Sequence, residues 1–287
     1  MVYMGSGRST DGLWLWKGTK RSQYKISQQC MPLYKNLVRS FHKMSIVDTT
    51  WGLLDDAEKG LLRQIGTMLI NDGFDVIGYG WSDDYNKSVR GVSSDLALLP
   101  EKRVVICVGN SRVLWPHAEK LLRAGEPDPF NMLSSSAAQK CERLCSLRGV
   151  PNTIFFSHLS SPFLVSFQHL AISTSIGVLH SPSQLVVHHT YGPWIGLRFA
   201  IVLKLSMENI CLNDLNENSE FSLDASESAA VAMVLQDQPY NALLHIAARR
   251  AFSTGAAHAY SDEQLSYHYH IPLSAVATCL SDSRVLA

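Results

Sequence analysis

Two β-rich segments on either side of a tight turn constrain the fold more than any other part of this sequence. Ser183 to Thr190 and Trp194 to Leu205 are rich in residues that favour strands. Tyr191-Gly-Pro193 between them has the composition of a turn. The pattern therefore predicts a β-hairpin.

An arginine stands inside the apolar second segment. In a regular strand successive side chains alternate between faces, which puts Arg198 on the face of Trp194, Gly196, Ala200 and Val202. A guanidinium keeps its charge, so burying it requires an anionic or strongly accepting partner. The small neighbours leave room for a ligand in that role. A carboxylate of the protein itself, or an arginine that reaches to the sheet edge, would satisfy the charge equally well.

The rest of the chain alternates helical and strand patterns. Helices are expected at Asp55–Asn71, Ala118–Arg123, Asn131–Leu147, Ser160–Ser173, Ala229–Gln236, Asn241–Phe252, and after Ser261, where Ser261-x-x-Gln264 has the capping-box form. Strands are expected at Phe74–Tyr79, Arg103–Val108 and Thr153–Phe156, and loops around Trp81–Ser94 and Asn213–Ser228. Hairpin-paired strands interspersed with helices indicate an α+β fold.

Composition limits the classes of function. Lys+Arg and Asp+Glu number 25 each among 287 residues, so no general field attracts nucleic acid or an anionic membrane. The absence of an apolar run of about 18 residues predicts a soluble protein. Residues 1–45 are basic with Asp11 as the one acid, a pattern typical of a transit segment or a disordered extension. We expect this extension to precede one domain at 46–287.

Cysteines and histidines do not predict a metal site. The one close cysteine pair, Cys141 and Cys145, fits packing on one helix face and lacks the second pair that zinc or iron–sulfur sites need. Unpaired cysteines are typical of a reduced, intracellular protein. On a strand His188 and His189 would point to opposite faces, and His268 with His270 has no third ligand nearby.

Five segments together resemble one family. The run from Tyr191 to Leu203, Tyr-Gly-Pro-Trp-Ile-Gly-Leu-Arg-Phe-Ala-Ile-Val-Leu, resembles the signature hairpin of the cyanocobalamin reductase/alkylcobalamin dealkylase family, the methylmalonic aciduria and homocystinuria type C protein family. The other four segments follow the family's order: Asn71–Val76, Tyr85-Asn86 with Leu98–Pro100, Asp128–Asn131, and Tyr260–Gln264 followed by Tyr267. Iron–sulfur cobalamin enzymes of the epoxyqueuosine reductase type have a similar hairpin but require cysteine clusters that this sequence lacks.

The resemblance implies a flavin-nitroreductase-like antiparallel sheet with flanking helices and a C-terminal helical cap. It further implies an oxidoreductase of cobalamin (vitamin B12) metabolism that binds cobalamin base-off and removes its upper axial ligand. Reductive decyanation would use FAD or FMN with NADPH, and dealkylation would use glutathione. A downstream cobalamin-trafficking protein is the expected partner, and a homodimer stays open. The cytoplasm is the expected location, or the mitochondrion if the basic segment directs transit.

Residue roles follow from the same resemblance. Arg198 and, after a shift of one position from Ala251, Arg250 match glutathione-binding arginines. The positions that match cobalamin contacts are Val165, Ser166, Phe167, Gln168, Val186 and Leu197. A third family arginine would fall near Ala275 and is absent, and Leu179-His-Ser-Pro182 replaces a tyrosine-rich stretch. These departures leave a non-catalytic cobalamin chaperone or adaptor as the alternative.

Overall fold

The structure is a computed structural model that describes residues 57–159, 164–205, 223–225, 229, 231–232 and 241–281. The chain divides into two compact units, and every described residue belongs to the unit that contains Asp55–Ala287. The basic extension expected at 1–45 lies outside the described residues. So do most of the loop expected at Asn213–Ser228 and most of the helix expected at Ala229–Gln236.

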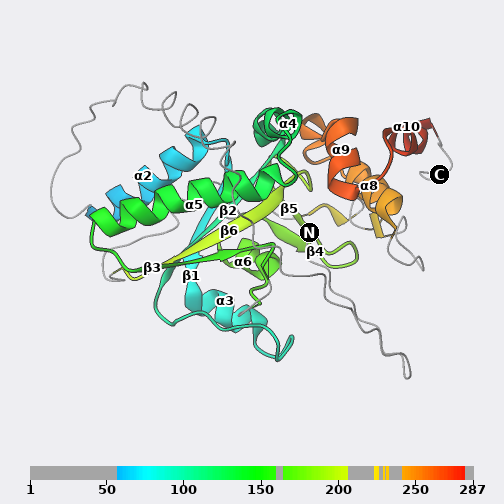
Figure 1. The fold of residues 1–287 in the computed structure, drawn as a ribbon. Helices are drawn as coiled ribbons and strands as arrows, with labels where there is room; N and C mark the ends of the chain where they lie inside the picture. The colour runs from blue at the N-terminus through cyan, green and yellow to red at the C-terminus, as the bar shows by residue number, and fades with distance from the viewer. Residues whose placement is uncertain are drawn as a thin grey trace, which may run out of the picture. The chain divides into compact units, whose positions relative to one another are not determined.

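A four-stranded antiparallel sheet forms the centre of the described unit (Figure 1). Its strands are β1 (Val76–Trp81), β2 (Val104–Asn110), β3 (Asn152–Phe156) and β6 (Gly196–Leu203), in the spatial order β1-β2-β6-β3. Every residue of the inner strand β2 is buried, as expected for a continuous Val/Ile-rich run. This confirms the α+β class with an antiparallel sheet and flanking helices.

Helices α2 (Ala57–Asn71) and α5 (Pro129–Leu147) lie together on one face of the sheet (Figure 1). The residues of α2 that recur at helical spacing, among them Leu61, Ile65 and Leu69, are buried in the core on this face. Cys141 and Cys145 pack in the same core as free thiols. Burial raises the pKa of Cys141 to about 12, which leaves it protonated and unreactive at neutral pH.

The other face of the sheet is covered by α3 (Ser82–Val89) and α6 (Phe167–Ser173). The loop predicted around Trp81–Ser94 is wrong for Ser82–Val89, which form α3. This short helix buries Tyr85 and Val89, four residues apart, and is polar elsewhere, so its apolar stripe is too narrow to reveal a helix. The helix expected from Ser160 begins instead at Phe167, where the hydroxyl of Ser166 accepts a hydrogen bond from the backbone N–H of His169.

The predicted hairpin is wrong, although its turn is present. β5 (Leu185–Val187) pairs with β4 (Val178–His180) in a separate two-stranded sheet, whereas β6 pairs with β2 and β3. His188 and Gly192 close the turn by exchanging two backbone hydrogen bonds of 2.8 Å. Pro193 then follows, and because it has no N–H it cannot extend the ladder, so the chain passes from one sheet to the other.

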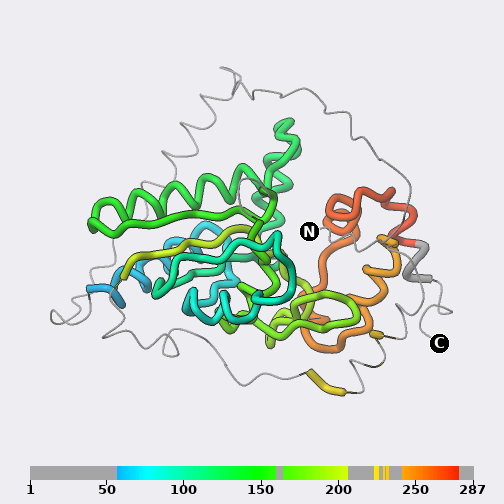
Figure 2. Tube along the Cα trace, turned by 90° about the horizontal axis from the view of Figure 1, so that it is seen from below, coloured from blue at the N-terminus to red at the C-terminus, as the bar shows by residue number. Residues whose placement is uncertain are grey.

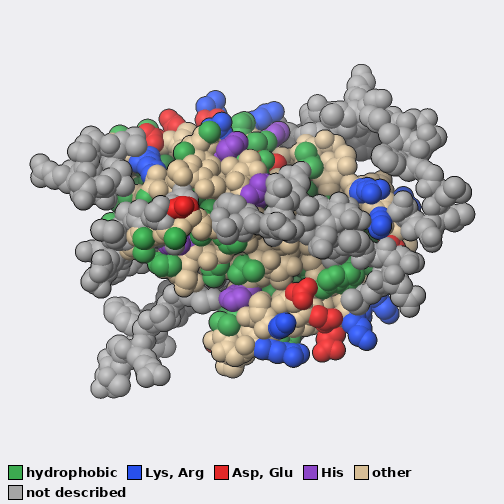
Figure 3. All heavy atoms as spheres, turned by 180° about the vertical axis from the view of Figure 1, so that it is seen from behind, with side chains coloured by type: hydrophobic (Ala, Val, Ile, Leu, Met, Phe, Trp, Pro, Cys, Tyr) green, Lys and Arg blue, Asp and Glu red, His purple; other side chains and the backbone are tan. Residues whose placement is uncertain are grey.

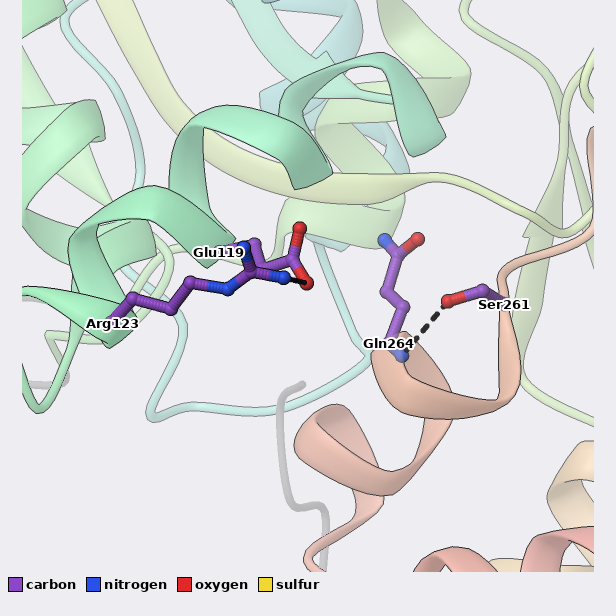
Figure 4. Close-up of polar contacts among 4 residues, drawn as sticks. All are labelled: Glu119, Arg123, Ser261 and Gln264. Atoms are coloured by element: carbon purple, nitrogen blue, oxygen red, sulfur yellow. Dashed lines mark hydrogen bonds and ion pairs between the residues drawn. The ribbon is translucent and has the colours of Figure 1, made fainter.

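The C-terminal helices are α8 (Ala242–Ala251), α9 (Asp262–Tyr269) and α10 (Leu273–Ser281), which group beyond the end of the sheet where β6 begins (Figure 2). The cap predicted at Ser261 is confirmed, since its hydroxyl accepts a hydrogen bond of 3.2 Å from the N–H of Gln264 (Figure 4). Trp194, just before β6, packs in a small core with residues of these helices, including Ile246 and Leu265. The sheet and the helices are thus joined at the start of β6.

Candidate functional site

A β-bulge places Arg198 on a different face from the one that the alternating pattern predicts. Val108 of β2 lies opposite Phe199, and Gly109 lies opposite Leu197, so Arg198 is an extra residue without a partner on β2. The extra residue reverses the alternation on one side of the bulge. Leu197 consequently packs in the α3/α6 core with Ala200 and Val202, and Arg198 turns toward α5. The expected face of Arg198 is therefore wrong.

The guanidinium of Arg198 contacts one amide and one aromatic ring. Its Nε donates a hydrogen bond of 2.6 Å to Oδ1 of Asn110, and its Cζ lies 4.2 Å from the ring centroid of Phe130. Within the described part of the chain, no carboxylate forms an ion pair with Arg198, and its two Nη atoms donate no hydrogen bond. Burial lowers the pKa of Arg198 below its usual range, while Tyr260, Tyr267 and Asp128 act in the opposite direction. The site holds a half-buried cation that the described protein does not neutralise.

A chain of polar groups continues from Asn110 to Asp75. Asn110 and Ser111 are fully buried at the end of β2, and Nδ2 of Asn110 donates a hydrogen bond of 2.6 Å to the carbonyl of Ser111. The N–H and the hydroxyl of Ser111 in turn donate to the two carboxylate oxygens of Asp75, at 2.7 and 2.5 Å. The carboxylate of Asp75 is therefore hydrogen-bonded by Ser111 and forms no ion pair with Arg198.

Aromatic side chains of α9, and Tyr260 just before it, cluster around the Phe130 ring that this cation contacts. The ring of Phe130 lies 4.9 Å from that of His268 and 5.6 Å from that of Tyr267, between ring centroids, and His268 lies 5.4 Å from Tyr260. Burial, reinforced by the charges of Arg198 and Arg249, lowers the pKa of His268 well below its usual value. His268 is therefore neutral at physiological pH and adds no second positive charge.

Two buried polar atoms near the site have no hydrogen-bond partner among the described residues. They are the hydroxyl of Tyr260 and Nε1 of Trp194, whose rings are in edge contact at 5.6 Å. Tyr260 is 7 % exposed and Trp194 is 1 % exposed. Leaving such donors unpaired costs about 1–3 kcal/mol each. An acceptor ligand would remove that cost, and the charge of Arg198 indicates that this ligand is an anion.

The other predicted glutathione-binding arginine already has a partner. Nη2 of Arg250 lies 3.2 Å from Oδ1 of Asp262 at the start of α9. Its Nη1 is buried and has no hydrogen-bond partner among the described residues. Its neighbour Arg249 instead donates from Nε to the hydroxyl of Tyr269, at 2.9 Å, and from Nη1 to the carbonyl of Pro193. Arg249 and Arg198 both influence the pKa values of Tyr260 and His268. Arg249 is therefore the C-terminal arginine that shares its electrostatic neighbours with Arg198.

The six expected cobalamin contacts gather on the opposite face of the sheet. Val165, Phe167, Val186 and Leu197 belong to the apolar core under α3 and α6. Ser166 is buried and its N–H donates to the hydroxyl of Tyr85 at 3.1 Å, while the amide of Gln168 reaches the carbonyl of Gln184 at 2.9 Å. Only Gln168 and Leu197 of the six are partly exposed. Leu197 and Arg198 are neighbours in the bulge, and their side chains lie on opposite faces of the sheet.

The histidine pair on the turn behaves differently from the prediction. The rings of His188 and His189 stack at 4.2 Å instead of pointing to opposite faces, because β5 ends at Val187 and both residues lie in the turn. Nδ1 of His188 accepts hydrogen bonds from the backbone N–H groups of Thr190 and Tyr191, at 3.0 and 3.3 Å.

No group of three or more His, Cys, Asp or Glu in the described residues could hold a metal ion. No described helix is long and apolar enough to cross a membrane.

Sequence reasoning missed three residues of this site: Asn110, Tyr260 as a polar group, and Arg249. Asn110 carried a signal, since it is the polar end of an otherwise apolar strand, but its contact with Arg198 spans 88 positions. Tyr260 was part of a motif segment without a role assigned to it.

On the visible surface over α3, acidic and basic side chains lie side by side and form no patch of one sign (Figure 3).

Four of the five motif segments meet at this site. The segments Asn71–Val76, Asp128–Asn131, Tyr191–Leu203 and Tyr260–Gln264 supply Asp75, Phe130, Arg198 and Tyr260. The fifth segment lies elsewhere: its Tyr85 and Asn86 are on α3, and the side-chain amide of Asn86 exchanges two hydrogen bonds of 2.8 Å with the backbone of Leu99. Four segments that are far apart in the sequence thus lie together around Arg198.

Comparison with known proteins shows a similarity of fold. No protein-family model matches the sequence, and no curated protein matches it. A solved structure with a similar fold is that of the B12-trafficking protein CblC from C. elegans, a homologue of human MMACHC. The TM-score is 0.56 at 15% sequence identity, over 78% of this chain and 95% of that chain. The resemblance that the motif segments indicate is therefore confirmed at the level of the fold, and this chain has a CblC-like fold.

Proposed function

We propose that this protein binds cobalamin inside the cell and processes its upper axial ligand. The CblC-like fold and the convergence of four motif segments on one site support this role. The similar protein of known structure is described as a B12-trafficking protein. A chaperone that binds cobalamin and passes it on unchanged is the second candidate, because the third family arginine, expected near Ala275, is absent.

One observation carries the proposal of a catalytic role, namely that the described protein provides no anion for Arg198. A half-buried guanidinium without a counter-ion is costly, and it is retained where a ligand supplies the negative charge. We propose that this ligand is a carboxylate of glutathione, with Arg198 as its principal contact. Arg250 would contribute through Nη1, which is buried without a hydrogen-bond partner among the described residues, while Nη2 stays paired with Asp262.

The proposed cobalamin surface lies on the other face of the sheet and reaches this site at the bulge, where Leu197 precedes Arg198. Gln168 and Leu197 would contact the ligand directly, since both are partly exposed. Val165, Ser166, Phe167 and Val186 would hold the wall behind them, because they are buried in the structure. Reductive removal of a cyano ligand would in addition require a flavin, FAD or FMN, and NADPH as the electron source. That requirement rests on the family resemblance alone.

Visible spectroscopy of the purified full chain with cyanocobalamin tests the proposal. We expect a shift to the base-off spectrum on binding, then loss of the cyano ligand when NADPH and flavin are added without oxygen. A base-off shift without decyanation, and without dealkylation of methylcobalamin by glutathione, would establish the chaperone. No spectral change at any step would refute the cobalamin role altogether.

Arginine variants separate the thiol step from cobalamin binding. Arg198→Ala should slow glutathione-dependent dealkylation of methylcobalamin by about 100-fold or more and leave the base-off shift intact, because a charge-assisted contact is lost. Arg123→Ala is the matched control, since Arg123 is exposed at the end of helix α4 (Trp115–Arg123) and paired with Glu119 (Figure 4). Equal loss of both signals in Arg198→Ala would show that the arginine is structural.

A further inference from the structure

We infer that Asn110 is a positioning residue that makes a ligand carboxylate approach Arg198 end-on, through its two Nη atoms. This inference rests on the proposed anion site. It says from which side a ligand carboxylate reaches Arg198 and which residue determines that side. The argument depends on which edges of the guanidinium are already occupied.

The first occupied edge is Nε. Oδ1 of Asn110 accepts its hydrogen bond at 2.6 Å, and the same amide donates through Nδ2 to the carbonyl of Ser111 at 2.6 Å. The orientation of the amide follows from these two partners, since a guanidinium only donates and a carbonyl only accepts. Both the acceptor oxygen and the donor nitrogen of the Asn110 side chain are therefore hydrogen-bonded, which sets the orientation of its amide.

Asp75 holds the far end of this chain of contacts. Its two carboxylate oxygens accept the N–H and the hydroxyl of Ser111 at 2.7 and 2.5 Å, which fixes the backbone at the end of β2. Ser157 fixes the bulge from the other neighbour, because its N–H and hydroxyl donate to the carbonyls of Arg198 and Leu197, each at 2.9 Å. Both strands next to the bulge thus hold Arg198 in place.

Two more approaches to the guanidinium are closed. Phe130 covers one face of its plane at 4.2 Å. Gly196 lies over the guanidinium on its Nε–Nη2 side, where a Cβ on this glycine would stand 2.9 Å from Nη2, 3.2 Å from Cζ and 3.4 Å from Nε. The end of the fork, where Nη1 and Nη2 point away from Nε, is the edge without a hydrogen-bonded partner among the described residues. A carboxylate with two oxygens matches that edge in a bidentate manner.

The neutrality of Asn110 matters as much as its position. An aspartate of the same size would also accept from Nε, but its negative charge would neutralise the guanidinium inside the protein. The amide orients the arginine and leaves its full charge for the ligand. Asn110 thereby determines both the geometry and the strength of carboxylate binding.

The test compares Asn110→Asp with Asn110→Ala and with Asn152→Asp in the full chain. Asn152→Asp is the matched control, because Asn152 lies opposite Leu203, at the other end of β6. Calorimetry measures binding of glutathione and of glutathione diethyl ester, which keeps the thiol but lacks both carboxylates. Selective NMR of the Arg198 Nε–H measures its exchange with water, and thermal unfolding checks that each variant is folded.

We expect Asn110→Asp to bind glutathione at least about tenfold more weakly than the unchanged protein, to bind the diester equally, and to keep the Nε–H protected. Asn110→Ala should speed Nε–H exchange about tenfold and weaken glutathione binding less than Asn110→Asp. Asn152→Asp should match the unchanged protein in all three measurements.

Two different failures are distinguishable. If the unchanged protein binds glutathione and Arg198→Ala abolishes this binding, but Asn110→Asp binds it normally, the positioning role of Asn110 is refuted and the anion site stands. If the unchanged protein binds neither glutathione nor the diester, the proposed glutathione site itself is refuted. An equal loss of both ligands in Asn110→Asp would assign Asn110 a merely structural role.

Discussion

The two ends of strand β6 differ in what they do. At one end, Phe199 to Leu203 pair in regular register with both neighbouring strands and are buried. At the other end, Gly196 to Arg198 contain the bulge and bring a guanidinium, a buried amide and an aromatic ring together. Regular pairing serves stability, and the irregular end positions a charge that the described protein does not pair. One strand therefore combines a regularly paired, buried half with an irregular half that holds an unpaired charge.

This division predicts opposite results for neighbouring residues. Phe199 is fully buried, and its ring lies 5.7 Å from that of Phe74 and 6.1 Å from that of Phe156. Phe199→Ala should lower the free energy of unfolding by about 3–5 kcal/mol, because it removes a large ring and leaves a cavity. Urea unfolding at constant pH measures this. A loss below 1 kcal/mol would mean that the regular end does not carry stability as the packing indicates.

His188, in the turn that leads into the bulged end, should make the free energy of unfolding fall as the pH falls. Burial, then the neighbouring His189 and His258, lowers the pKa of His188 to about 3. A pKa below the unfolded value of about 6.5 means that stability is full above pH 6.5 and falls as the pH drops toward 3. Between pH 7 and pH 5 the loss from His188 amounts to about 2 kcal/mol.

His188→Asn is the variant that isolates this effect, since its amide oxygen can still accept the N–H groups of Thr190 and Tyr191. Its unfolding free energy should change less between pH 7 and pH 5 than that of the unchanged protein. Because His268 also has a lowered pKa, part of the dependence should remain. An identical pH dependence in both proteins would show that His188 is not buried in its neutral form.

A smaller effect is expected at the glycine of the bulged end. The Cβ of Gly196→Ala would stand 2.9 Å from Nη2 of Arg198, and the flexible end of that side chain can move away. We expect about tenfold weaker binding of glutathione with a change in melting temperature of about 2 °C or less. In an Arg198→Met background the same substitution should have no further effect on binding. A large loss of stability would mean that the guanidinium cannot move.

The regular half of the molecule was predictable and the functional half largely was not. The periodicity of α2 and α5, the apolar runs of β1, β2 and β3, and the cap at Ser261 are local signals, and the structure confirms them. The hairpin was wrong because the residues of β5 and β6 are equally strand-like whichever partners they take. Strand composition does not determine which strands pair.

The bulge explains why the site resisted prediction. A strictly alternating pattern places Arg198 with Ala200, whereas one extra residue in the register turns it toward Phe130. Such an insertion changes no residue type, so composition and periodicity do not reveal it. The sequence did indicate that Arg198 needs an acceptor. The acceptor of its Nε is Asn110, a residue 88 positions away that only the fold brings near.

The unfolding free energy of Arg198→Met, measured with and without glutathione, tests most directly whether the charge of Arg198 serves a ligand. Because the described protein provides no anion for this charge, the methionine variant should lose without glutathione only the cost of leaving Oδ1 of Asn110 unpaired, about 1–2 kcal/mol. Saturating glutathione should stabilise the unchanged protein and leave the variant unaffected. A loss of about 3 kcal/mol or more that does not depend on glutathione would contradict this account, since it is the cost of breaking an internal ion pair.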